Sequence, residues 1–134
     1  MANVVYPLAK QAFLSAGLDL TSVTLKAVLV DTGAYTYSAS HANLSDIPAP
    51  ARIATSGALA SKTVANGVFD AADVSIPNVV GATVEAIVIY KDTGTASTSS
   101  LVAYIDTGSG LPYTPNSAQV DIAWDNSASK IFAL

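Results

Sequence analysis

The sequence predicts a mainly β protein, a single-domain antiparallel β-sandwich or barrel with one short N-terminal helix. Three observations lead to this prediction. Short stretches of alternating apolar and polar residues follow one another along most of the chain, and this alternation is the period of a half-buried strand. Turn-forming residues separate these stretches at intervals of about a dozen residues. The length of 134 residues fits one domain (1–134), and no linker or internal repeat divides it.

The N-terminal part is expected to hold the helix, over residues 7–16, ahead of a β-rich body over residues 18–134. Pro7 suits the first helical turn, and Gly17 suits the position just past the helix end. One face of this helix would carry Leu8, Ala12, Phe13 and Ala16. Residues 1–6 precede the helix, and we expect them to form an N-terminal arm.

The first strand of the body is predicted over residues 23–30. Its apolar residues alternate with Thr24 and Lys26, and Val28 and Val30 then make the C-terminal half apolar on both faces, so this half should be buried. Residues 34–50 contain two prolines and many polar residues, which predicts a long loop with a helical turn near residues 43–47. Loops of this length are commonly functional or packed against a partner.

The remaining strands follow from turn signals and apolar runs. Asn66-Gly67 lies between two apolar stretches and is a strong hairpin signal, because both turn residues tolerate positive φ. The nearly continuous apolar run at 84–90 predicts a central strand. The predicted strands are 59–64, 68–76, 84–90, 101–106, 120–124 and a terminal strand at 130–134.

The composition excludes several classes of function. The net charge is −4 and charged residues make up 12%, which argues against nucleic acid and anionic membranes as partners. The absence of cysteine excludes disulfides, thiolate metal sites and a cysteine nucleophile. No signal peptide or membrane-spanning run is evident. Ala, Ser and Thr supply 51 residues, which indicates either a surface for assembly or a compositional bias.

The tripeptide Asp-Thr-Gly occurs three times, beginning at Asp31, Asp92 and Asp106. Aspartic proteases bring two such carboxylates together to share one proton, and residues 28–34 resemble the retroviral protease signature. Each copy also directly follows a predicted strand, where Asp caps a turn through its own side chain. Three copies fit three turns better than one active site, so we expect no catalytic residues.

Other candidate residues are weaker. His41 is the only histidine and lies in a polar loop. A Ser-His-Asp triad would have to use it, but the sequence has no Gly-x-Ser-x-Gly motif to supply the serine. Asp121 and Asp125 are candidate ligands for an adventitious calcium ion, but no segment matches a calcium-binding loop, so no metal or cofactor is expected. Tyr35 and Tyr37 suggest either a platform for stacking a sugar or half-buried strand-edge residues.

Several segments together resemble small virion structural proteins of tailed bacteriophages. They are NVVYPLAK (3–10), LDLTSVTLKAVLVD (18–31), YTYS (35–38), the hairpin segments LASKTV (59–64) and FDAAD (69–73), IYKDTG (89–94), and WDN (124–126). The resemblance implies a protein without catalysis, cofactor or disulfides, made in the host bacterial cytoplasm and located in the virion.

The resemblance implies, first of all, a head decoration or cement protein. Its expected partners are the major capsid protein and copies of itself, and the expected partner contacts are Asn3, Val4, Val5 and Tyr6 on the N-terminal arm. One alternative is a tail or fibre component that binds the host surface through loop 34–50. A more remote alternative is an aspartic protease that uses Asp31.

Overall fold

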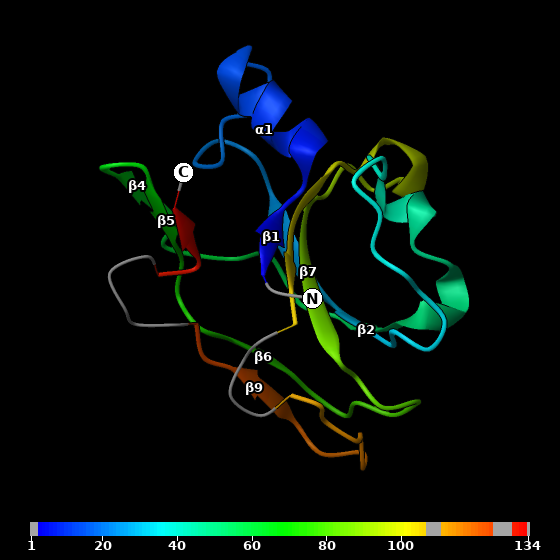
Figure 1. Ribbon diagram of the computed structural model, residues 1–134. Helices are drawn as coiled ribbons and strands as arrows, with labels where there is room; N and C mark the ends of the chain where they lie inside the picture. The colour runs from blue at the N-terminus through cyan, green and yellow to red at the C-terminus, as the bar shows by residue number, and fades with distance from the viewer. Residues whose placement is uncertain (1–2, 107–110, 125–129, 134) are drawn as a thin grey trace.

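The computed structural model describes residues 3–106, 111–124 and 130–133. In these residues the protein is mainly β, with one α-helix and three antiparallel sheets (Figure 1). The predicted fold class, a mainly β single domain with one short helix, is confirmed. No helix in the described ranges combines the length and the apolar character needed to cross a membrane.

The largest sheet has five strands in the order β1-β8-β7-β2-β3. Its centre is the antiparallel pair β2 and β7, which stays in register from Leu25 opposite Lys91 to Val30 opposite Ala86. The strands of this sheet are β1 (Val4–Val5), β2 (Leu25–Val30), β3 (Arg52–Thr55), β7 (Ala86–Lys91) and β8 (Leu101–Ile105).

Both faces of the central strands are buried, as the apolar run in β2 predicts. Val28 and Val88 pack in the core on one face, whereas Leu29 belongs to a separate core cluster on the other. Successive side chains of a strand point to opposite faces, so residues 27–30 of β2, which are all apolar, must be covered on both sides. The sheet therefore lies in the middle of the molecule.

The long segment after β2 covers the first face. It contains two short 3₁₀ helices, η1 (Leu44–Asp46) and η2 (Ala49–Ala51), in agreement with the helical turn predicted near residues 43–47. Its buried side chains pack with Val28 and Val30 of the sheet. They are Tyr35, Leu44, Ile47 and Ala51.

Two small sheets cover the second face and give the molecule a sandwich-like layering (Figure 1). Phe69 packs with Leu25 of β2, and Ile76 packs with Leu29. The first small sheet has the order β10-β5-β4, and the second pairs β6 with β9. Their strands are β4 (Thr63–Ala65), β5 (Val68–Asp70), β6 (Val74–Ile76), β9 (Val120–Ile122) and β10 (Phe132–Ala133).

The predicted hairpin is confirmed, but its second strand is shorter than expected. Asn66 and Gly67 have φ values of 52° and 78°, and Ala65 pairs with Val68 across the turn. The stretch 68–76 then divides into β5 and β6, which belong to different sheets. An apolar alternation cannot reveal a change of sheet, because the side-chain period is the same on either side of the break.

The helix α1 (Pro7–Leu14) ends two residues before the predicted boundary. Ala16 has a φ of 58°, and the Gly17 N–H donates a 2.8 Å hydrogen bond to the Ala12 carbonyl. The left-handed position that closes the helix is therefore Ala16, with Gly17 one residue beyond it.

The N-terminal segment differs most from the expectation of an arm. Val4 and Val5 form β1, opposite Tyr104 and Ala103 of β8. Val5 and Tyr6 are buried in the core, and the Tyr6 N–H donates a hydrogen bond to the Val102 carbonyl. Residues 4–6 are thus part of the body of the protein. Sequence patterns missed β1 and β3, because one is too short and the other lacks an apolar alternation.

Candidate functional site

The Asp-Thr-Gly segments lie at turns that follow strands. The Asp31 carboxylate accepts a 2.8 Å hydrogen bond from the Gly33 N–H, and the Asp92 carboxylate accepts one of 3.0 Å from the Gly94 N–H. Asp92 also forms an ion pair of 2.9 Å with Lys26, at the opposite end of β7 from Asp31. These contacts support the turn-capping interpretation for both segments. Thr107 and Gly108 of the third segment lie outside the described residues.

The arrangement of strands keeps two of these aspartates on separate sides of β7. Asp31 follows β2, and Asp106 follows β8, and β7 lies between these strands. Since neighbouring strands are about 4.8 Å apart, the two backbones are about 10 Å apart. The shared proton of an aspartic protease needs carboxylates about 3 Å apart, and the Asp31 carboxylate is turned back onto its own loop. The geometry therefore favours caps over a catalytic pair.

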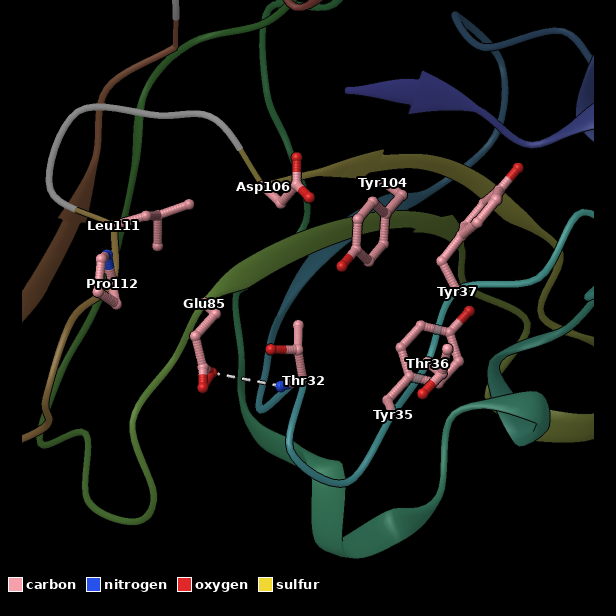
Figure 2. Close-up of a pocket in the computed structure, with 9 residues that line it drawn as sticks. All are labelled: Thr32, Tyr35, Thr36, Tyr37, Glu85, Tyr104, Asp106, Leu111 and Pro112. Carbon is pink, nitrogen blue, oxygen red and sulfur yellow. Dashed lines mark hydrogen bonds between the residues drawn. The ribbon is translucent and has the colours of Figure 1, made fainter. Parts of the chain in front are cut away.

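A cavity of about 450 Å³, the tyrosine pocket, opens at the end of the sheet where β2 and β8 finish and β7 begins (Figure 2). Glu85 precedes β7, Asp106 follows β8, and Thr32 follows β2, so strand register brings these three residues together. The segment after β2 adds the aromatic wall. The lining residues are Thr32, Tyr35, Thr36, Tyr37, Glu85, Tyr104, Asp106, Leu111 and Pro112.

Hydrogen bonds and ring contacts hold the aromatic wall in place. The Tyr35 hydroxyl lies 2.9 Å from the Tyr6 hydroxyl and 2.9 Å from His41 Nδ1. The Tyr104 ring lies 5.4 Å from the Tyr37 ring and 6.4 Å from the Tyr35 ring, in tilted arrangements typical of aromatic clusters. Burial is the main cause that raises the pKa of the Tyr6 phenol far above its usual value.

Neither interpretation of Tyr35 and Tyr37 holds as stated, because both residues lie in the segment between β2 and β3 and not at a strand edge. Tyr35 is 3% exposed and its hydroxyl is engaged on two sides, whereas Tyr37 is half-buried. The pair is therefore a wall of a pocket and not a flat exposed platform. His41 serves as a hydrogen-bond partner of Tyr35.

The tyrosine pocket is electrically negative. Glu85 and Asp106 both line it, and no lysine, arginine or histidine is found among its described lining residues. Burial raises the pKa of the Tyr104 phenol, and the charges of Asp106 and Glu85 raise it further. The Glu85 carboxylate also accepts a 3.3 Å hydrogen bond from the Thr32 N–H, which fixes it at the pocket wall.

Metal binding finds little support in the described ranges. They contain no group of three or more His, Cys, Asp or Glu residues placed to hold a metal ion. Asp121, a candidate calcium ligand, accepts hydrogen bonds from Ser75 and Gln119, and these bonds lower the pKa of its carboxyl. The other candidate, Asp125, lies outside the described residues.

A second hollow, the N-terminal groove, has a volume of about 670 Å³ and is mostly apolar. It lies between β1, α1, β8 and β10, elements that Figure 1 shows around the blue β1 arrow. Its lining residues are Asn3, Val4, Val5, Lys10, Leu14, Ala103, Tyr104, Ile105, Ile131, Phe132 and Ala133. Leu14 is 91% exposed and is the most exposed large apolar side chain among the described residues.

The predicted partner contacts all lie at or beside this groove, but not as a free arm. Asn3 is exposed and Val4 is half-buried, whereas Val5 and Tyr6 are buried. Contact of this segment with a partner stays a prediction, and Asn3 and Val4 are the side chains that a partner can reach. Sequence reasoning missed Leu14, although an apolar residue off the buried face of a helix was a usable signal.

No known protein-family model matches the chain, and no curated protein matches it at a significant level. Its function is therefore inferred from its own residues and their arrangement.

Proposed function

We propose that this protein is a non-enzymatic structural component of a bacteriophage particle, a decoration or cement protein on the outer surface of the head. Its partners would be the major capsid protein and neighbouring copies of itself. The sequence resemblance and the abundance of small neutral residues support this proposal. The observation that carries it is the apolar N-terminal groove at the open edge of the five-stranded sheet.

In the part of the chain that the structure describes, β1 is an edge strand that pairs with β8 alone, so its outer side can pair with a partner. The Tyr6 N–H points toward β8, because it donates to the Val102 carbonyl. Hydrogen-bonding groups alternate in direction along an antiparallel strand, so the Val5 N–H and carbonyl point to the outer side. An extended segment of the capsid protein can pair with these groups as a sixth strand, which is a common mode of peptide recognition.

Side chains around β1 provide the apolar part of such an interface. Leu14 and Phe132 flank the groove from α1 and β10, and both would lose water contact beneath an added strand. Lys10 is the single basic residue among the described lining residues, so little charge would have to be desolvated. The groove therefore favours a closely packed, mainly apolar contact with the capsid protein.

Stabilisation of the shell would follow from selective binding. A protein that binds the expanded capsid lattice and not its precursor shifts the equilibrium toward the expanded form by mass action. No bond is made or broken in this role, so no catalytic residue is needed. A shell with the protein bound should therefore resist heat better than a bare shell.

The first test is immunogold electron microscopy of the parent phage with antibody against this protein. Label spread over the head is the expected result. Label confined to the tail would reject decoration and favour the alternative, a tail or fibre component that binds the host surface. Absence of label from intact particles would reject a role on the particle surface altogether.

The second test compares two exposed apolar residues on bare expanded heads. Leu14→Ser should lower the affinity for heads about tenfold, because burying a leucine side chain contributes about 1.5–3 kcal/mol. Val80→Ser is the matched control, since Val80 is also exposed (60%) but lies outside the groove. Circular dichroism would verify that both variants fold. Equal binding of the two variants would show that the groove is not the docking site.

A further inference from the structure

We infer that the tyrosine pocket is a binding site for a guanidinium group, as carried by an arginine side chain. The inference concerns the isolated protein and does not rest on the proposed role in the phage head. At about 450 Å³ the pocket lies within the size range of small-ligand sites, about 300–1,000 Å³. The chemistry of its walls determines which ligand fits.

The polar groups of the pocket are dominated by hydrogen-bond acceptors. Glu85 and Asp106 contribute two carboxylates, which only accept hydrogen bonds when ionised. Tyrosine and threonine hydroxyls supply the remaining side-chain polar groups, and the described lining residues include no side chain with an N–H donor. A complementary ligand must therefore be rich in donors and positively charged. A guanidinium group has five N–H donors in one plane and pairs well with carboxylates.

Tyr104 offers a further acceptor inside the pocket. Its side chain is 5% exposed, and Figure 2 shows its hydroxyl directed toward the side of the pocket where Thr32 and Glu85 lie. Within residues 3–106, 111–124 and 130–133 this hydroxyl has no hydrogen-bond partner. A bound N–H donor can therefore pair with this hydroxyl without displacing another group of the described protein. The hydroxyl is thus available to a polar ligand in addition to the two carboxylates.

The tyrosine rings add a second kind of attraction for the same ligand. Tyr35, Tyr37 and Tyr104 form a connected aromatic cluster along one side of the pocket. The face of an aromatic ring attracts a cation, and arginine stacks on such faces more often than lysine does. Carboxylates and rings on different walls therefore favour the same flat, positively charged group.

A neutral sugar fits the pocket less well. Sugar hydroxyls can pair with the hydroxyls and carboxylates of the pocket, but a neutral sugar brings no positive charge to Glu85 and Asp106. The described lining residues include two carboxylates and no lysine, arginine or histidine, and burial of carboxylate charge beneath a neutral ligand would be costly. The charge of the pocket thus decides in favour of the cation.

The test is a titration of the ¹⁵N-labelled full chain followed by NMR. The ligand is N-acetyl-L-arginine methylamide, and the matched control ligand is the citrulline analogue, which has nearly the same shape but no charge. We expect shifts at pocket residues with the arginine ligand, at least about tenfold weaker binding of the citrulline ligand, and weaker binding at high salt. Free L-arginine as a further ligand distinguishes a polypeptide source from a free small molecule.

Protein variants locate the site. Binding should weaken about tenfold or more in the double variant Glu85→Gln, Asp106→Asn, because charge-assisted hydrogen bonds are lost. Asp19→Asn removes one charge from an exposed side chain in the segment before β2, at the other end of that strand from the pocket, and should bind normally. Tyr104→Phe keeps the ring and should weaken binding even if the double variant fails to fold.

Three results would overturn the inference. The first is equal binding of the arginine and citrulline ligands. The second is binding of a neutral sugar at the pocket in the absence of arginine binding. The third is the absence of shifts at pocket residues at tens of millimolar arginine ligand. None of these results bears on head binding through the groove, so failure of this inference and failure of the proposed function can be told apart.

Discussion

Replacing Tyr6 by alanine should remove a large part of the stability of this protein. Tyr6 is 0% exposed, and its ring packs 5.2 Å from the Tyr37 ring in the core beneath residues 35–51. Truncation of a buried aromatic side chain to alanine costs about 3–5 kcal/mol. A domain of this size has a total stability of about 5–15 kcal/mol, so the loss is about a fifth or more of the total.

Tyr6→Phe separates the ring from the hydroxyl. The Tyr6 hydroxyl lies 2.9 Å from the Tyr35 hydroxyl, and Tyr35 keeps His41 as a second partner in the variant. The expected cost is therefore that of one net hydrogen bond, about 0.5–1.5 kcal/mol. Leu14→Ala is the control in the same N-terminal region, because Leu14 is 91% exposed and its truncation should change stability by less than about 0.5 kcal/mol.

Urea unfolding followed by Trp124 fluorescence and far-ultraviolet circular dichroism measures these differences. Trp124 reports on the packed state, since its indole N–H donates a 3.0 Å hydrogen bond to the Ala72 carbonyl. The reasoning fails if Tyr6→Ala unfolds within about 1 kcal/mol of the wild type, with an unchanged slope. In that case the N-terminal residues would form a dispensable arm, as their position in the sequence suggests.

Two further predictions test the hairpin and a loop carboxylate. Gly67→Ala should lower the free energy of unfolding by about 1–2 kcal/mol, because φ at Gly67 is 78°. Gly57→Ala is the control in the same urea assay and should be nearly neutral, because nothing lies within 4 Å of the added methyl group. Backbone N–H bonds from Asn43 and Ala42 lower the pKa of the Asp46 carboxyl, so its contribution to stability is complete above about pH 4 and is lost as the pH falls below that. The urea concentration at the midpoint of unfolding should therefore fall less between neutral and acidic pH in Asp46→Asn than in the wild type. An identical fall in both proteins would show that Asp46 does not contribute to the pH dependence of stability.

The central part of the fold could be predicted from the sequence because its signals are local. A strand with apolar residues on both faces must lie between two covering layers, and this pattern located β2 and β7. The hairpin turn followed from Asn66-Gly67 in the same way. Both signals reside in a few consecutive residues, so they can be recognised without knowledge of the partner strands.

The missing elements depend on distant pairings. Val4 of β1 pairs with Tyr104, a residue far away in the sequence. A strand of two residues is also too short to show an apolar alternation. The tyrosine pocket has the same origin. Tyr35 and Tyr37 attracted attention as a pair, but Glu85 became a pocket residue only through the register of β7 with its neighbours. The order of the strands in the sheet could therefore not be predicted from local sequence patterns, and the pocket depends on that order.

Tyr104 belongs to both hollows, and this position makes the two proposed sites experimentally separable. Its ring packs with Tyr35 and Tyr37, and the residue also lines the N-terminal groove. Tyr104→Phe removes the hydroxyl from the tyrosine pocket but leaves the apolar ring that the groove contacts. It should therefore weaken arginine binding and spare head binding, whereas Leu14→Ser, outside the tyrosine pocket, should do the reverse. Loss of both activities in either variant would mean that the two hollows act as one site.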